Sequence, residues 1–282
     1  MRSQLNRRQL FFTYLALILV ALFILIPIWE LVYLAFEGGI VDRPTSFHFF
    51  PLKPTFSVFV EMWNRAGQNI TFLQALRNSM IVSLGAAMLS VTLGASMAYA
   101  IARFRFPGRQ LGLFGLLVGT LLPPVALMTP LFLLVRTINI QSTLFALIIV
   151  YTSFAMPFAV WNMRAAFQAV PKELEEAAFL DGAGNFITFW YVDLPLALPA
   201  IGIAAIVAFL IGYSEFAMGW MFVTRSEQVT LAMTISGILV QGSRHWSLMA
   251  ALSVLMSIPV VVVFIGLQKA FLERMLFGNI NE

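Results

Sequence analysis

The sequence predicts an all-α integral membrane protein with about six transmembrane helices and a cytoplasmic loop between the fourth and the fifth. Of the 282 residues, 60% are hydrophobic and 11% are charged, whereas a soluble globular domain carries about 25% charged residues. Long apolar segments alternate with charged or turn-forming ones, and a helix needs about 20 apolar residues to cross a bilayer. The chain therefore has too little polar surface for a water-soluble fold of its size.

The composition also excludes several kinds of site. The chain has no cysteine, which removes disulfide frameworks, thiol catalysis and cysteine-based metal sites. The two histidines, His48 and His245, fall in predicted loops, so we expect no metal site. The net charge of +4 comes from basic residues beside apolar runs, where they act as topology signals. We therefore expect lipid around the chain and no nucleic-acid partner.

The first span follows a short basic N-terminus, residues 1–9, which we expect to be cytoplasmic. Its apolar run continues to about Phe36, which is too long for the apolar core of a signal peptide. We therefore predict an uncleaved helix that opens a single transmembrane domain, residues 10–282. The six predicted spans cover residues 10–35, 78–102, 110–134, 142–166, 197–222 and 247–271.

The distribution of Lys and Arg predicts the orientation of the spans, because the cytoplasmic side carries the excess. One side holds ten basic residues, at both ends of the chain, in the loop 103–109 and around Arg164 and Lys172. The other side holds seven, and four of these lie in or just after the long loop 37–72. We therefore place both termini, the tail 272–282 included, in the cytoplasm. The loop 37–72 then lies outside, where it is either a contact for an external partner or a passive connector.

Small residues recur every four positions in the second span, which places them on one face of a helix. Such faces let transmembrane backbones approach closely, so we expect this span to pack inside a bundle. Prolines interrupt the third span at Pro123, Pro124 and Pro130 and the fourth at Pro157. Proline kinks a helix, and broken helices are tolerated where they line a cavity. The small residues are Ala86, Ser90, Gly94, Ala98 and Ala102.

The loop 171–195 differs from the rest of the chain. Pro171 suits a helix start, and the acidic residues after it favour a helix N-terminus. Gly182 supplies a left-handed residue that ends the helix. Asn185 is a candidate cap for a second, amphipathic helix, which Leu194-Pro195 ends. The local pattern predicts a helix–turn–helix at the cytoplasmic membrane face, suited to docking.

This loop resembles the EAA loop of the permeases of ABC importers, and its extended form resembles the carbohydrate-uptake, MalG-type branch of binding-protein-dependent sugar importers. Asn78-Ser79, Arg103–Gly108 and Tyr213–Phe216 match the same family in order, so the resemblance covers nearly the whole chain. The residues that match the loop motif are Glu176, Ala177, Ala178, Gly182, Val192, Leu194 and Pro195, with Val192 where isoleucine is usual.

The resemblance implies that the loop forms a coupling helix in a cleft of a separate ATPase subunit. Glu176 would make polar contacts there, Ala177 and Ala178 would permit close approach, and Gly182 would make the turn. It also implies a prokaryotic inner or plasma membrane, a second homologous permease subunit, an ATPase dimer and an extracytoplasmic solute-binding protein. The full set of expected ATPase-coupling residues is Glu176, Ala177, Ala178, Asp181, Gly182, Leu194 and Pro195.

The chain itself is expected not to be an enzyme, and we expect no catalytic residue in it. A phosphate-cradling loop ends in Gly-Lys-Ser/Thr, and no Gly-Lys pair occurs in the sequence. The resemblance therefore implies that ATP and Mg²⁺ bind the partner ATPase and that this chain holds no cofactor.

Ionisable residues inside a span are functional candidates, and Glu215 is the deepest one here. The expected substrate is a sugar, such as a maltose- or trehalose-type oligosaccharide. Another polar solute of the glycerol-phosphate type is an alternative, although no Lys or Arg lies in the middle of a span to pair with phosphate. A secondary transporter is a further alternative that the lack of visible internal repeats disfavours. The candidate pathway residues are Glu215, Tyr213, Ser214, Tyr151 and Ser153, with Thr152 beside them.

Overall fold

The computed structural model describes residues 6–38, 48–67, 69–240 and 246–277, with side chains described except for 239–240 and 267–277. Four helices in this part of the chain are long and apolar enough to cross a membrane. Two further pairs of helices, each bent at a short break, bring the possible spans to six. The four long helices are α1 (Arg7–Phe36), α3 (Phe72–Arg103), α6 (Leu144–Ala169) and α13 (Trp246–Phe277).

Shorter helices complete the described fold, and the predicted all-α class is confirmed. One short helix, α12, lies between the fifth and sixth predicted spans, in a stretch to which the sequence analysis assigned no helix. The shorter helices are α2 (Ser57–Asn64), α4 (Arg109–Leu121), α5 (Pro124–Thr137), α7 (Lys172–Leu180), α8 (Asn185–Thr188), α9 (Leu194–Leu196), α10 (Leu198–Ser214), α11 (Ala217–Phe222) and α12 (Leu231–Val240).

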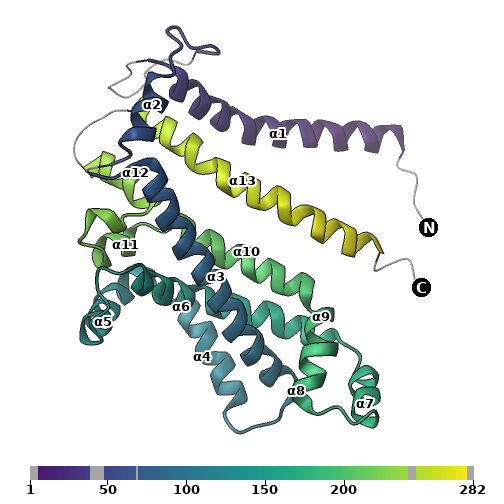
Figure 1. The fold of residues 1–282 in the computed structure, drawn as a ribbon. Coiled ribbons are helices and arrows are strands. Elements are labelled where there is room, and N and C mark those ends of the chain that lie inside the picture. Colours follow the sequence, from purple (N-terminus) through teal and green to yellow (C-terminus); the bar gives the residue numbers. More distant parts are fainter. Residues whose placement is uncertain (1–5, 39–47, 68, 241–245, 278–282) are drawn as a thin grey trace.

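Three helices, α3, α6 and α10, pack against one another and form the centre of the bundle. Helices α1 and α13 run side by side along one flank of it (Figure 1). The start of α1, the end of α13 and helix α7 lie toward one end of the molecule, and α2 and α12 lie toward the other (Figure 1). The loop 171–195 and both described chain ends therefore share one end, as the predicted topology requires.

The contact between α3 and α6 depends on the small residues of α3. At Gly94 an added Cβ would lie 2.8 Å from the Met163 Cε atom and 3.3 Å from the Ala159 Cβ atom. Because lipid gives helices no hydrophobic drive to associate, this close approach replaces it with van der Waals contact. The expected packing face is confirmed, since Ala86, Ser90, Gly94 and Ala98 are buried and Ala102 is partly buried.

The third predicted span, residues 110–134, is two helices in the structure. Helices α4 and α5 meet at an angle of 108°. Leu122 and Pro123 are both extended, with ψ of 128° and 131°. Each precedes a proline, which disfavours helical backbone at the residue before it. The consecutive Pro123 and Pro124 therefore produce a sharp break where one kinked helix was expected.

The stretch before α12 is fixed to α3 by two polar side chains. The Asn78 Nδ2 atom donates to the backbone oxygens of Glu227 and Val229, at 2.8 and 3.0 Å. The Ser79 hydroxyl accepts from the Leu231 backbone N–H at 2.8 Å. Both side chains are buried, so their hydrogen bonds satisfy backbone groups that water cannot reach. Asn78 and Ser79 thus hold in place a helix that the sequence analysis missed.

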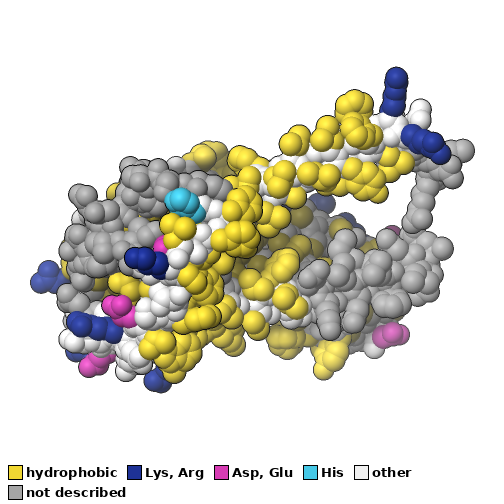
Figure 2. All heavy atoms as spheres, turned by 90° about the horizontal axis from the view of Figure 1, so that it is seen from above, with side chains coloured by type: hydrophobic (Ala, Val, Ile, Leu, Met, Phe, Trp, Pro, Cys, Tyr) yellow, Lys and Arg dark blue, Asp and Glu magenta, His cyan; other side chains and the backbone are white. Residues whose placement is uncertain are grey.

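The surface matches a molecule embedded in lipid. Hydrophobic side chains cover the protruding helix α1, and Lys and Arg side chains stand at its tip (Figure 2). Phe23, in the middle of α1, is 81% exposed. Charged side chains gather again at the opposite end of the molecule (Figure 2). An apolar belt between two charged ends is what a bilayer requires.

Candidate functional site

Helix α7 begins after Pro171 and ends in the turn that the sequence predicted. Gly182 has a φ of +85°, a left-handed conformation that glycine adopts without steric cost. The Gly182 N–H donates to the Phe179 oxygen and the Ala183 N–H to the Ala178 oxygen. These two bonds form a Schellman motif, which satisfies the last carbonyl groups of a helix. The position of the turn at Gly182 is therefore confirmed.

The second half of the loop departs from two details of the expectation. Asn185 is the first residue of α8, and Gly184 is the capping residue, without a side-chain cap bond. A π-helical turn (Phe189–Asp193) and α9 then carry the chain past Pro195, and the bend of 76° to α10 follows Leu196. This wider turn lies just before Pro195, which has no N–H to donate to a helical hydrogen bond. The described end, at Leu196, lies one residue beyond the predicted Leu194-Pro195.

Arg103, the last residue of α3, joins the two halves of this loop to the bundle. Its Nη2 atom forms an ion pair with the Glu175 carboxylate of α7. The same atom lies 3.3 Å from Asp193 Oδ1 and donates to the Val170 oxygen at 3.0 Å. The side chains of Arg103, Glu175 and Asp193 are 9%, 11% and 0% exposed. We call these three residues the Arg103 clamp.

The sequence analysis did not identify the Arg103 clamp. It treated Arg103 as one of the basic topology signals and singled out Glu176, the exposed neighbour of Glu175. Arg103 and Asp193 are 90 positions apart, so no local pattern links them. One signal was nevertheless available. Arg103 ends a span on the same predicted side of the membrane as the acidic residues of the loop 171–195, so an ion pair between them was possible.

The Arg103 clamp contains two carboxylates and one guanidinium. Burial, and then the hydrogen bond and charge of the neighbouring Asp193, raise the pKa of Glu175 to about 7, while the Arg103 charge opposes them. A carboxyl group so placed exchanges its proton near neutral pH.

The other side of the loop is open to solvent. Leu180 is 89% exposed, and Phe186 and Tyr191 are also exposed. An exposed apolar patch of this kind marks a contact surface. The predicted coupling residues lie on or beside it: Glu176, Ala177, Asp181, Gly182 and Pro195 are exposed, and Ala178 and Leu194 are partly buried.

Glu215 lies at a break in the fifth predicted span, residues 197–222. Helix α10 ends at Ser214, and Glu215 is extended, with ψ of 132°. Its carboxylate accepts hydrogen bonds from the Met218 N–H at 3.1 Å and the Gly219 N–H at 3.4 Å. These are N–H groups at the start of α11, which lack partners within the helix. Glu215 therefore caps α11 and stabilises the break.

The other pathway candidates do not form one lining. The Tyr213 hydroxyl donates to the Met256 oxygen at 2.9 Å and ties α10 to α13. The Ser214 hydroxyl is exposed and bonds the Leu210 oxygen within its own helix. Ser153 and Thr152 bond α6 carbonyl groups. Tyr151 is fully buried, and a Cβ added at Gly219 would lie 3.3 Å from its hydroxyl oxygen. Of this group, Ser153 and Ser214 are exposed, and the other three are buried.

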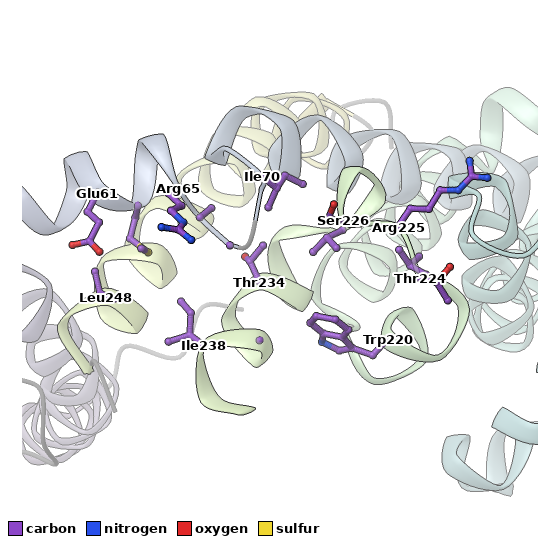
Figure 3. Close-up of a pocket in the computed structure, with 16 residues that line it drawn as sticks. Glu61, Arg65, Ile70, Trp220, Thr224, Arg225, Ser226, Thr234, Ile238 and Leu248 are labelled. Carbon is purple, nitrogen blue, oxygen red and sulfur yellow. The ribbon is translucent and has the colours of Figure 1, made fainter. Parts of the chain in front are cut away.

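A pocket of about 460 Å³ lies between α2, α11 and α12, away from the loop 171–195. Glu61 of α2 and Arg65, the residue after α2, stand on one side of it and Trp220 on the other (Figure 3). Trp220 belongs to α11, so the cap at Glu215 also fixes this wall of the pocket. The described residues contain no group of three or more His, Cys, Asp or Glu side chains that could hold a metal ion.

Residues 90–277, which include α7, the Arg103 clamp and Glu215, match the family model described as "Binding-protein-dependent transport system inner membrane component". The chain belongs to this family. It is therefore a permease subunit, the membrane component of a transporter, and it is not itself an enzyme.

The permease is similar along most of its length to curated sugar permeases. It is 32% identical over 214 residues to the trehalose transport system permease protein SugB of Mycobacterium tuberculosis, covering 74% of this chain and 77% of that protein. It is 27% identical over 268 residues to the maltodextrin permease MdxG of Bacillus subtilis, covering 95% and 94%. It is 30% identical over 282 residues to the diacetylchitobiose permease NgcG of Streptomyces coelicolor, covering 98% and 89%.

The fold of the permease also matches a solved transporter. A chain of a bacterial ABC transporter involved in the import of the acidic polysaccharide alginate superposes with a TM-score of 0.73. The match covers 95% of this chain and 99% of that one at 21% identity. This likeness confirms the fold of an ABC-importer membrane subunit.

Proposed function

We propose that the permease is one of two membrane-spanning subunits of an importer that takes up an oligosaccharide. An extracytoplasmic binding protein delivers the sugar, and a dimer of separate ATPase subunits, which bind ATP and Mg²⁺, drives its passage. The observation that carries this proposal is the loop 171–195, which is clamped to α3 on one side and open on the other.

The geometry of the loop suits a mechanical connection. Its exposed side offers Glu176 and the apolar residues around Leu180 to the ATPase. Its buried side is held by Arg103 at the end of α3. Helix α3 in turn packs along α6 and α10. A displacement of the loop by the ATPase would therefore move the centre of the bundle and, through α10, the break at Glu215.

A neutral or hydroxyl-rich substrate fits the break at Glu215, between α10 and α11, better than an anion does. Glu215 carries a carboxylate there, and its neighbour Ser214 exposes a hydroxyl group. A phosphorylated substrate would need a basic partner, whereas the nearest functional groups are acidic or hydroxylic. The curated relatives, named for trehalose, maltodextrin and diacetylchitobiose, support a sugar.

The test is coupled transport by the complete importer reconstituted in liposomes, with its ATPase and binding protein. Glu176→Lys and Gly182→Val are expected to lower uptake at least about ten-fold, while ATP hydrolysis continues. Both positions are exposed and lie outside the predicted spans, so membrane insertion should persist. Val at Gly182 meets no neighbouring atom, but it strains the left-handed turn that ends α7. Normal uptake by both variants would overturn the coupling role.

Glu227→Lys is the matched control, because Glu227 is also exposed and lies outside the loop 171–195. This variant should keep the wild-type ratio of uptake to hydrolysis. Trehalose, maltotriose, diacetylchitobiose and glycerol 3-phosphate are supplied separately with the binding protein. Stimulation of ATP hydrolysis by glycerol 3-phosphate alone would overturn the sugar assignment and leave the coupling result intact.

A further inference from the structure

Basic side chains gather where α3 ends and α4 begins. A pocket of about 340 Å³ lies between this connection and α7. Two residues of the Arg103 clamp, Arg103 and Glu175, contribute to its wall, and they pair with each other there. The residues that line it are Ala102, Arg103, Arg105, Arg109, Lys172, Glu175, Glu176 and Phe179.

The remaining charges at the pocket are mostly positive. Arg105, Arg109 and Lys172 face one further carboxylate, that of Glu176. No ion pair within the described part of the chain involves any of these three basic residues. The Arg109 Nη1 atom donates to the Phe104 carbonyl oxygen at 3.4 Å, which leaves its charge uncompensated. The pocket therefore carries an excess of positive charge, which favours the binding of an anion.

A second hollow, of about 520 Å³, shares Arg105 and Arg109 and continues onto α4. It is lined further by Phe106 and Leu111, both exposed. Phe114 extends the exposed apolar surface along the same helix. The basic pocket thus opens onto an apolar helix at the point where that helix enters the predicted membrane region.

We propose that Arg105, Arg109 and Lys172 bind the phosphate of an anionic phospholipid whose acyl chains lie along α4. Guanidinium groups match phosphate oxygens in a bidentate geometry, and basic pockets between transmembrane helices at the membrane surface hold anionic headgroups. The apolar surface of α4 selects a lipid over a soluble phosphate. Since Lys172 begins α7, the lipid would also brace the loop 171–195, a consequence that rests on the proposed coupling role.

The test is native mass spectrometry of the purified permease complex in neutral detergent. Dioleoyl-phosphatidylglycerol and dioleoyl-phosphatidylcholine are added in equal amounts, with inorganic phosphate as a separate arm. The wild type should retain the anionic lipid about ten-fold more than the neutral one, since each basic residue at a membrane surface adds to that attraction. The triple variant Arg105→Gln, Arg109→Gln, Lys172→Gln should lose this preference.

A matched triple variant, Arg65→Gln, Arg136→Gln, Arg225→Gln, removes the same charge elsewhere and should keep the preference. Arg105→Lys with Arg109→Lys keeps the charge and loses the bidentate geometry, so it should retain a smaller preference, which separates lost binding from lost folding. Equal retention of both lipids by the wild type would overturn the proposal. So would a preference that survives in the triple Gln variant, displacement by inorganic phosphate, or loss of the lipid when the ATPase joins the permease pair. These results need no transport, so they are independent of the coupling test.

Discussion

The Arg103 side chain faces two buried carboxylates, and this imbalance defines the chemistry of the clamp at the residue scale. One guanidinium cannot neutralise both Glu175 and Asp193, and charges buried without compensation are costly. Burial, and then the hydrogen bond and charge of the neighbouring Asp193, raise the pKa of Glu175 to about 7. Near neutral pH Glu175 therefore gains and loses a proton, and the clamp carries one more negative charge when the proton is lost.

The stability of the purified permease should fall as pH rises through this range. The folded pKa of Glu175, about 7, lies above its ordinary 4.5, so the folded state holds the proton more tightly. The stabilisation is complete below about 4.5 and is lost as pH rises through about 7. Thermal unfolding of the wild type and of Glu175→Gln, which stays neutral, measures it. The variant should show a smaller fall in Tm between pH 5 and 8, and equal slopes would contradict the assignment.

At the scale of elements, the α4–α5 break and the α10–α11 break have different origins and differ in how far the sequence reveals them. The α4–α5 break comes from Pro123 and Pro124, and the sequence indicated a kink there. The α10–α11 break has no proline at its corner. It is stabilised by the Glu215 carboxylate on the N–H groups of α11, a contact that exists only once the chain has turned.

The same distinction explains the rest of the comparison between sequence and structure. Apolar length predicted the long helices, and the residue type at Gly182 predicted its turn, because both depend on local chemistry. Helix α12 is too short for a span and depends on Asn78 and Ser79, about 150 positions away. The Arg103 clamp likewise depends on a contact between distant segments. The orientation of the chain and the roles of Glu176 and Glu215 remain predictions.

Substitution at Gly94 should separate α3 from α6. A Cβ there meets the flexible Met163 methyl group and the Ala159 side chain, so Gly94→Ala should cost little. Gly94→Val adds bulk that cannot move away and should destabilise the chain by about 1–3 kcal/mol. Gly115→Val on α4 is the control, because nothing lies within 4 Å of a Cβ there. Thermal unfolding in detergent measures the difference. Equal losses at Gly94 and Gly115 would contradict the packing argument.

At the scale of the whole molecule, the loop 171–195 and the described ends of α1 and α13 lie toward one end, and α2 lies toward the other (Figure 1). This arrangement agrees with the excess of Lys and Arg on the side that we predict to be cytoplasmic. It also gives the topology two convenient markers, because Asp181 and Leu52 are both exposed.

The absence of cysteine makes this topology directly measurable. A membrane-impermeant maleimide should label Leu52→Cys in intact cells and Asp181→Cys only after the membrane is opened. The cysteine-free parent is the background control. Labelling of Asp181→Cys in intact cells, with Leu52→Cys protected, would reverse the predicted orientation.

The pairing of α1 with α13 has a consequence for how the protein is made. The ribosome completes α1 before α13, and roughly 210 residues separate the end of one from the start of the other. At a synthesis rate of about 5–20 residues per second, α1 waits roughly 10–40 s for its main partner. During that time it must be stable in lipid alone, which explains why its apolar side chains surround the whole helix and do not form one stripe. Helix α13, made later, completes the packing of α1.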